Sequence, residues 1–303
     1  MIVVAGEALV DLLVRPDGSM AAVPGGGPYN TARAIGRLGP SVAWLGGLSS
    51  DRFGQLLETG LVADGVALDL VQRTDVPTTL ALAELDAAGA AAYRFYSEGT
   101  SAPQVAGTVA LPAGTVALHV GSLGMVLEPM ATTLEALVAS LPDDVLLMVD
   151  PNCRPSVTAD RDAYLARIER VLSRADIVKA SREDLAFLRP NDGVDDAERW
   201  VAARGARAVL VTDGAGVVTV LAGGLTHRVE VPRVEVVDTV GAGDTFGGAA
   251  LGWLVHEGIT RATLHATAAV GAARFGARAA AITCARPGAD PPTLAELGGW
   301  APA

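Results

Sequence analysis

Short, mainly apolar segments alternate along the chain with longer segments that carry apolar residues at helical spacing, and this alternation limits the possible folds more than any other feature. The apolar segments include VALHV, VLLMV, DIVKA and AVLVT, and a helical pattern follows most of them. Continuous apolar strands are typical of a parallel sheet that is covered by helices on both faces. We therefore expect an α/β chain that folds into three α/β/α layers around a mainly parallel central sheet.

One stretch departs from this rhythm. Residues 78–98 alternate apolar and polar side chains at period two on both sides of Ala87-Ala88-Gly89, which predicts an antiparallel hairpin. With residues 9–24, the hairpin is expected to form a small sheet, called the lid below, inserted in a single domain of residues 1–303. Such a lid could close over the carboxyl edge of the main sheet, where open α/β folds bind ligands.

Composition excludes several classes of function. The net charge is −11 and no basic block is present, so we expect neither nucleic acid nor an anionic membrane as a partner. No apolar run is long enough for a membrane span, and the N-terminus does not resemble a signal peptide. The two cysteines, Cys153 and Cys284, lie far apart, which favours a reducing cytoplasm over a disulfide framework.

The stretch DTVGAGDTF, residues 238–246, is the clearest candidate for chemistry. We expect a strand to end near Val237 and a helix to begin near Gly243 or Asp244. The first amides of a helix have no partners within the helix and can bind an anion, and a carboxylate beside them can take a proton from a hydroxyl group. A simple N-cap aspartate explains the pattern equally well. The glycine spacing and the late position fit a dinucleotide fingerprint poorly, and no Walker A lysine follows.

Several stretches in the same order resemble the ribokinase-like, or phosphofructokinase-B, carbohydrate kinases. They are GEALVDLL, PGGGPYNTARAIGRLG, VDPNCRP, DIVKASREDLAFL, VLVTDGAGV, DTVGAGDTF and ARPGADPP. The resemblance covers almost the whole chain and is strongest to bacterial fructokinases. It implies a ribokinase-like fold and an ATP-dependent kinase that phosphorylates a primary hydroxyl of a sugar.

The resemblance also implies roles for the glycine turn. Asp244 would take the proton from the sugar hydroxyl, while the amides of Gly241, Ala242 and Gly243 would hold the transferred phosphoryl group. A monovalent cation, K⁺ for example, would fix the geometry of the loops. Its expected ligands are Asp238 and the carbonyls of Val240, Arg286 and Gly288.

Sugar contacts are expected from two segments, one near the N-terminus and the other on the hairpin. The resemblance places Asp11 and the residues of the glycine-rich signature, Gly26, Gly27 and Asn30, beside the sugar. On the hairpin, Arg94 and Tyr96 share one face of the strand, while Tyr93 and Phe95 share the other. We expect Arg94 and Tyr96 to contact the sugar.

Nucleotide contacts are expected from Arg154, Ser181, Thr212, Gly214 and Gly243. Asn152 is an alternative to Arg154 as the residue near the phosphates. ATP would bring Mg²⁺, for which the phosphates supply most ligands. The family often has Asn-x-x-Glu to organise water around the metal, whereas this chain has Ser181-x-x-Asp184, so either Glu183 or Asp184 could serve. The same spacing is a plausible helix cap.

D-fructose is the expected acceptor, with fructose 6-phosphate as product. Kinases for 2-keto-3-deoxygluconate, ribose or nucleosides remain alternatives within the family. A relative that binds sugar or nucleotide without catalysis is an alternative from another class, and a dinucleotide-dependent oxidoreductase is a third. A homodimer through the lids is also expected, because exposed sheet edges often find cover from a partner.

Overall fold

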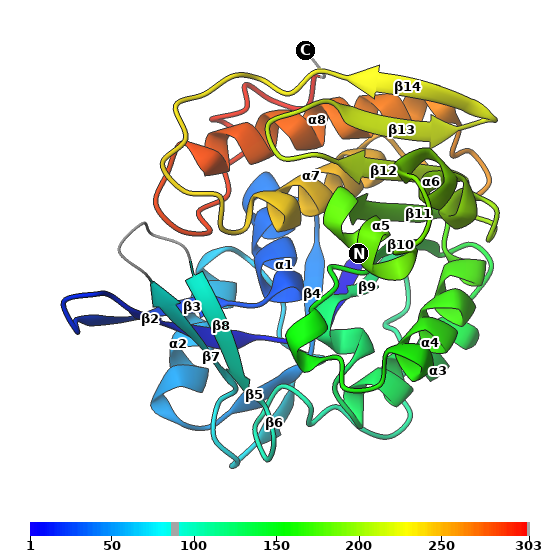
Figure 1. Cartoon of the computed structure of the whole chain (residues 1–303). Helices are drawn as coiled ribbons and strands as arrows, with labels where there is room; N and C mark the ends of the chain where they lie inside the picture. Colours follow the sequence, from blue (N-terminus) through cyan, green and yellow to red (C-terminus); the bar gives the residue numbers. More distant parts are fainter. Residues whose placement is uncertain (86–90, 302–303) are drawn as a thin grey trace.

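The computed structural model describes residues 1–85 and 91–301, and in this part of the chain the central sheet has eight strands (Figure 1). Their order is β14-β13-β12-β11-β10-β9-β1-β4, with β12 to β4 parallel and β13 and β14 antiparallel. The strands are β1 (Ile2–Ala5), β4 (Val42–Leu45), β9 (Ala117–Gly121), β10 (Leu146–Asp150), β11 (Ile177–Ser181), β12 (Ala208–Thr212), β13 (Val218–Ala222) and β14 (Leu225–Val229).

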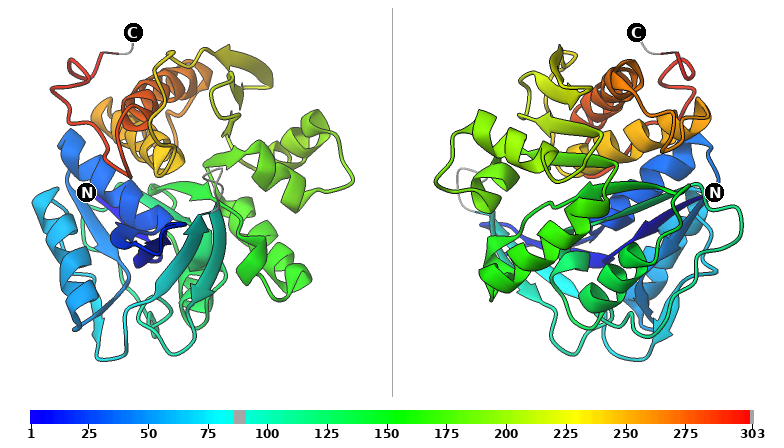
Figure 2. Two further views of the ribbon diagram at one scale, coloured as in Figure 1. Left: turned by 60° about the vertical axis from the view of Figure 1, so that its left-hand side comes forward. Right: turned by 90° about the vertical axis from the view of Figure 1, so that its right-hand side faces the viewer.

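Helices cover both faces of this sheet, which confirms the three-layer expectation (Figure 2). Ile2 and Val4 of β1 join the core beneath α1, α7 and α8, while Val3 and Ala5 join the core beneath α3 and α4. The helices are α1 (Gly27–Leu38), α2 (Arg52–Ala63), α3 (Met130–Ala139), α4 (Arg161–Arg174), α5 (Arg182–Leu188), α6 (Val194–Ala202), α7 (Ala242–His256) and α8 (Ala266–Cys284), with short 3₁₀ turns η1 (Ser122–Met125) and η2 (Pro155–Val157). Each described helix is too short or too polar to cross a bilayer.

The small sheet expected from the period-two pattern is present. Its strands lie in the order β3-β2-β7-β8, where β2 and β7 are parallel and both outer pairs are antiparallel. They are β2 (Leu9–Val14), β3 (Met20–Gly25), β7 (Leu80–Leu85) and β8 (Ala91–Tyr96). The turn predicted at Ala87-Ala88-Gly89 lies outside the described residues.

Two apolar segments differ from the strands that their sequences predict. The run VAWLGGLS, which predicts one strand, divides at Gly46 into β4 and β5 (Gly47–Ser49), and β5 pairs with β6 (Gln72–Thr74) in a separate two-stranded sheet. The strand predicted to end near Val237 is absent from the described residues, and this segment forms an exposed connection instead. Its amide at Val237 donates to the carbonyl of Cys284 at 2.8 Å, so it follows the end of α8 and does not pair with the sheet.

Helix α7 begins beside α1 because their backbones approach closely. A Cβ atom on Gly248 would lie 2.8 Å from the carbonyl oxygen of Thr31, so only glycine allows this packing. The contact brings the first turn of α7 next to the first turn of α1 (Figure 1). Both helix N-termini therefore lie at the carboxyl edge of the parallel strands.

Candidate active site at the carboxyl edge of the sheet

A cavity of about 470 Å³ lies between the lid and the carboxyl ends of β1, β9 and β10. The main sheet contributes the loop residues that follow these three strands, Glu7, Ser122 and Asn152. The lid contributes Asp11 and Phe95. The chain runs from β1 to β4 on one side and returns to β9 on the other, so the cavity lies where the strand order reverses. Ligands of open α/β sheets bind at such positions.

Asp244 is a partly buried carboxylate in the first turn of α7, and it lines this cavity. Its Oδ2 accepts a hydrogen bond from Asn30 Nδ2 at 2.9 Å, and its Oδ1 accepts a longer one from Asn152 Nδ2 at 3.5 Å. Burial raises the pKa of Asp244, while Lys179, the Asn30 hydrogen bond and Arg154 oppose that rise. The carboxylate is therefore held in a fixed orientation with a raised affinity for a proton.

The backbone amides before Asp244 are partly available for an anion. Gly241 caps the helix with φ = 74°, a conformation that favours glycine. Within residues 1–85 and 91–301, the amides of Gly241 and Gly243 donate to no protein atom. The Ala242 amide, however, donates to the carbonyl of Thr239 at 3.2 Å, because the chain makes a turn there. The expectation of three available amides is therefore corrected to two, those of Gly241 and Gly243.

A buried ion pair supports this turn, and sequence reasoning missed it. Lys179 Nζ lies 2.8 Å from Asp150 Oδ2, and the two side chains are only 5% and 4% exposed. A Cβ atom on Gly243 would lie 3.1 Å from Nζ, so the ammonium group is adjacent to the amides. Burial alone would lower the pKa of Lys179, but Asp150, Asp184 and Asp244 raise it on balance, so it stays charged. A lysine inside the apolar strand DIVKAS was the available signal.

Glu7 holds the glycine-rich loop in place and was also missed. Its Oε1 accepts the Gly27 amide and its Oε2 accepts the Gly124 amide, each at 3.1 Å. Burial raises the pKa of Glu7 to about 7, against the hydrogen bonds it accepts and the charge of Arg154. Gly26 and Gly27 both line the cavity, and Gly26 has φ = 109°. The signal for Glu7 was a carboxylate directly after the first apolar strand.

Asp11 faces the cavity from the lid, as its expected role requires. It lies on β2, an inner strand of the small sheet, and a Cβ atom on Gly25 would lie 2.2 Å from its Oδ2. Burial raises the pKa of Asp11 to about 6, with Arg154 opposing the rise and Asp244 adding to it. Three carboxylates of raised pKa, Glu7, Asp11 and Asp244, therefore line one cavity.

The expectation for Arg94 and Tyr96 is corrected by the strand register. Asp11, Ala81 and Phe95 are register partners across the lid and share its inner face. Phe95 lines the cavity, whereas Arg94 is 72% exposed beside Glu84 and the side chain of Tyr96 is exposed. Period two identified the pairs correctly, but it could not tell which pair faces inward.

Two non-glycine residues with positive φ angles line the cavity. Ser122 has φ = 53° and Asn152 has φ = 39°, and each follows a parallel strand. Such conformations are uncommon for residues with a side chain and gather at functional sites. Here they turn the chain so that Asn152 reaches Asp244.

The residues expected to contact the nucleotide are only partly brought together. Arg154 lines the cavity with Asp244 and Gly243. Ser181 and Thr212 lie at the carboxyl ends of β11 and β12, outside its lining, and Gly214 lies in the turn before β13.

Asp184 is committed to protein contacts. Its Oδ2 accepts the amide and the hydroxyl of Ser181 at 2.7 and 2.8 Å, and its Oδ1 accepts the amide of Cys153 at 2.6 Å. With the Ser181 hydroxyl bonded to its amide, this is a capping box for α5. Asp184 therefore fixes α5 to the loop after β10, whereas the Glu183 side chain is exposed with no polar partner among the described residues.

Asp238 joins the glycine turn to the C-terminal loop. Its Oδ1 accepts the Val240 amide at 3.0 Å and its Oδ2 accepts the Gly288 amide at 2.8 Å. The Gly288 carbonyl already accepts the amide of Asp290 at 2.9 Å. Carboxylate and carbonyl oxygens are the kinds of ligand that hard cations prefer. In residues 1–85 and 91–301, no group of three His, Cys, Asp or Glu is arranged to hold a metal ion.

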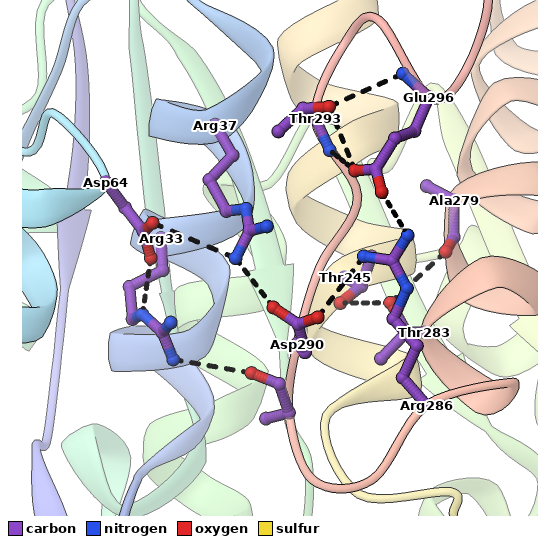
Figure 3. Close-up of polar contacts among 11 residues, drawn as sticks. Arg33, Arg37, Asp64, Thr245, Ala279, Thr283, Arg286, Asp290, Thr293 and Glu296 are labelled. Carbon is purple, nitrogen blue, oxygen red and sulfur yellow. Dashed lines mark hydrogen bonds and ion pairs between the residues drawn. The ribbon is translucent and has the colours of Figure 1, made fainter. Parts of the chain in front are cut away.

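Ion pairs anchor this C-terminal loop to α1 (Figure 3). Arg37 binds Asp290 at 2.7 Å, and Arg33 donates to the carbonyl of Ala289 at 3.3 Å. Arg286 pairs with Asp290 and with Glu296, so its guanidinium is committed to the C-terminal loop (Figure 3). These contacts hold Ala289 against Gly241, where a Cβ atom on the glycine would lie 2.5 Å from that of the alanine.

Comparisons with known proteins agree with this geometry. The profile of the pfkB family carbohydrate kinases matches residues 1–296. A fructokinase of Rhizobium leguminosarum bv. trifolii is 38% identical over 258 residues, which cover 81% of this chain and 77% of that protein. A fructokinase of Klebsiella pneumoniae is 35% identical over 269 residues, 84% of this chain and 85% of that protein. A crystal structure of a fructokinase from Xylella fastidiosa with bound ATP superposes with a TM-score of 0.87 at 28% identity, covering 98% of this chain and 96% of that one.

Proposed function

The chain belongs to the pfkB family of carbohydrate kinases, and we propose that it transfers the γ-phosphoryl group of ATP to the primary hydroxyl of D-fructose. Asp244 carries this proposal, because it is a partly buried carboxylate of raised pKa next to two uncommitted amides in a cavity at the strand ends. Two relatives that align with more than four fifths of the chain are fructokinases. Fructose is therefore the first acceptor to test.

In the proposed reaction, Asp244 accepts the proton of the sugar hydroxyl as that oxygen attacks the γ-phosphorus. Asn30 and Asn152 keep the carboxylate oriented. The amides of Gly241 and Gly243, with the adjacent ammonium of Lys179, stabilise the charge on the phosphoryl oxygens. Removing one such donor typically costs about 10²–10³-fold in rate.

The sugar would bind between Asp11 and Asn30. Asn30 Oδ1 is buried with no hydrogen-bond partner among the described residues, so it can accept from a sugar hydroxyl. Asp11 provides a second acceptor from the lid, and Phe95 with Leu9 gives the cavity an apolar side. Closure of the lid would exclude water, which protects ATP from hydrolysis.

The nucleotide would lie across the carboxyl ends of β11 and β12, with its phosphates near Arg154. Mg²⁺, when bound with ATP, would neutralise part of the phosphate charge. Asp184 does not fit as its ligand, because three protein donors already use both of its oxygens. Glu183 has uncommitted oxygens and is the acid that we propose near the metal.

A monovalent cation such as K⁺ would be held by Asp238 and by the carbonyls of Val240 and Arg286. Support comes from the hydrogen bonds that bring both loops to one carboxylate. The Gly288 carbonyl is the weaker candidate, since it already accepts a hydrogen bond.

Two further properties remain proposals. The face of the lid opposite Asp11 carries the exposed Tyr96, while Leu12 and Leu80 on that face are only partly buried against the core, which supports a homodimer through the lids. Both cysteines are free, which is consistent with a reducing compartment such as the cytoplasm.

The decisive experiment is a sugar panel with ATP, Mg²⁺ and K⁺, followed by identification of the product. We expect fructose to give the highest kcat/KM and fructose 6-phosphate to be the product. A higher kcat/KM for 2-keto-3-deoxygluconate or ribose would identify that sugar as the acceptor and leave the chain a kinase of the same family. Sugar binding without ADP release from folded protein would instead support a non-catalytic relative.

A further inference from the structure

A second cavity, of about 560 Å³, lies between α6 and the β13–β14 hairpin. Val218 and Val220 of β13 point into the core beneath α8, whereas Thr219 and Leu221 point the opposite way and line this cavity. It shares no lining residue with the catalytic cavity. Figure 1 shows the hairpin at the edge of the main sheet with α6 beside it.

The charge of this lining is opposite to that of the chain. Among the described lining residues, four arginines accompany two carboxylates, which gives a net charge of +2 in a protein of net charge −11. The arginines are Arg182, Arg199, Arg207 and Arg228, and the acids are Asp195 and Glu198. Three of these arginines pair with acids outside the lining: Arg182 with Asp213, Arg199 with Asp196, and Arg207 with Asp176. Arg228 is therefore the guanidinium of this lining that is available to an anion.

Glu198 and Arg228 are two polar side chains in the cavity whose bonding capacity is unused. Glu198 is only 6% exposed, yet its carboxylate has no hydrogen bond or ion pair within the described residues. The guanidinium of Arg228, on β14, also has no such partner there. By contrast, Arg182 pairs with Asp213 at 3.1 Å. The Glu198 oxygens reach the cavity, where a bound ligand can supply the hydrogen-bond donors that the protein does not.

We propose that this cavity is a second binding site, for a phosphorylated sugar or polyol. Arg228 would hold the phosphate, because a guanidinium matches phosphate oxygens in a two-point contact. Glu198 would accept hydrogen bonds from the ligand's hydroxyl groups, which are donors that it now lacks. The volume exceeds the roughly 470 Å³ of the catalytic cavity, so a six-carbon phosphate fits. The described lining contains no aromatic side chain to stack on a base, which disfavours a nucleotide.

Calorimetric titration of the whole chain with D-glucitol 6-phosphate tests this site. We expect one equivalent to bind in the wild type, and Arg228→Ala to weaken that binding at least tenfold. Glu198→Gln should weaken it by a smaller factor, since an amide accepts fewer hydrogen bonds than a carboxylate. Arg274→Ala is the matched control, because the Arg274 side chain is also exposed and has no polar partner among the described residues.

Two further titrations distinguish binding at this site from binding in the catalytic cavity and from capture of the phosphate group alone. Asp11→Ala, in the catalytic cavity, should leave the affinity unchanged, and inorganic phosphate should bind at least tenfold more weakly than the polyol phosphate. The proposal is overturned if the wild type does not bind, if Arg228→Ala binds as the wild type does, or if Asp11→Ala abolishes binding. Equal affinity for inorganic phosphate would also overturn it, because Glu198 would then contribute nothing.

Discussion

Two buried aspartates at opposite ends of β10 and β11 have very different surroundings. Asp176, at the amino end, has both oxygens engaged: Oδ1 with Arg261 at 2.8 Å, and Oδ2 with Arg174 at 3.1 Å and with the Leu147 amide at 2.9 Å. Asp150, at the carboxyl end, pairs with Lys179 through Oδ2 alone.

The other oxygen of Asp150 is buried and has no partner among the described residues. Burial raises the pKa of Asp150 to about 6, against the attraction of Lys179. An unsatisfied polar atom reduces stability, and it persists where a site must keep bonding capacity for a ligand. The contrast indicates that the amino end of the sheet is built for stability and the carboxyl end for binding and catalysis.

The largest effect is expected at the carboxyl end, from Asp244→Ala. Loss of the base should reduce kcat by about 10³-fold or more, which is the upper part of the range typical of general-base catalysis. Binding of ATP and sugar should persist, because neither depends on a proton acceptor. Steady-state rates with calorimetric binding measure both, and near-normal turnover would remove Asp244 from the mechanism.

The next effect sharpens the role of the ion pair at the same end. Lys179→Met should reduce kcat by about 10²–10³-fold, because the charge beside the phosphoryl amides is lost. The double variant Lys179→Met, Asp150→Leu is the control, since it leaves no buried carboxylate unpaired. A double variant that folds like the wild type but regains full kcat would show that the lysine only neutralises Asp150.

At the amino end, Asp176→Ala should reduce the free energy of unfolding and leave kcat nearly unchanged. The loss is about 3 kcal/mol, because Arg174, Arg261 and the Leu147 amide lose their acceptor together. Urea unfolding measures it. A stable variant with impaired kcat would break the distinction between the two ends.

The pH profile tests the raised pKa values of the cavity. Asp244 must be ionised to accept a proton, and Asp11 to accept a hydroxyl donor, so activity requires the deprotonated forms. The pKa of Asp11 is raised to about 6 and that of Asp244 is also raised. Hence protonation of Asp11 should lower kcat/KM by about tenfold per unit as pH drops below about 6, and protonation of Asp244 should steepen the fall. A profile flat down to about pH 4.5 would contradict this.

The smallest effect concerns the two faces of the lid. Arg94→Ala should change kcat/KM less than about twofold, because its ion pair with Glu84 is exposed. Phe95→Ala should raise KM for the sugar, since Phe95 lines the cavity. Steady-state kinetics of both variants would identify the inner face, and the reverse order of effects would return Arg94 to the site.

The three layers and the helix N-terminus at Asp244 could be predicted from the sequence. Continuous apolar strands predict a sheet that is buried on both faces, and Asp244 beside a glycine turn predicts a helix N-terminus with exposed amides. Both inferences depend on local periodicity and spacing, which are properties of neighbouring residues.

The contacts between distant groups, and the face of the lid that points inward, could be found only from the folded chain. Lys179 and Asp150 lie on neighbouring strands, 29 residues apart in the sequence, and Glu7 reaches two separate loops. The period of two places Phe95 and Arg94 on opposite faces of the strand, but the packing of the lid determines that Phe95 faces the cavity. Such pairings depend on how distant segments pack, and the spacing of residues along one segment does not contain that information.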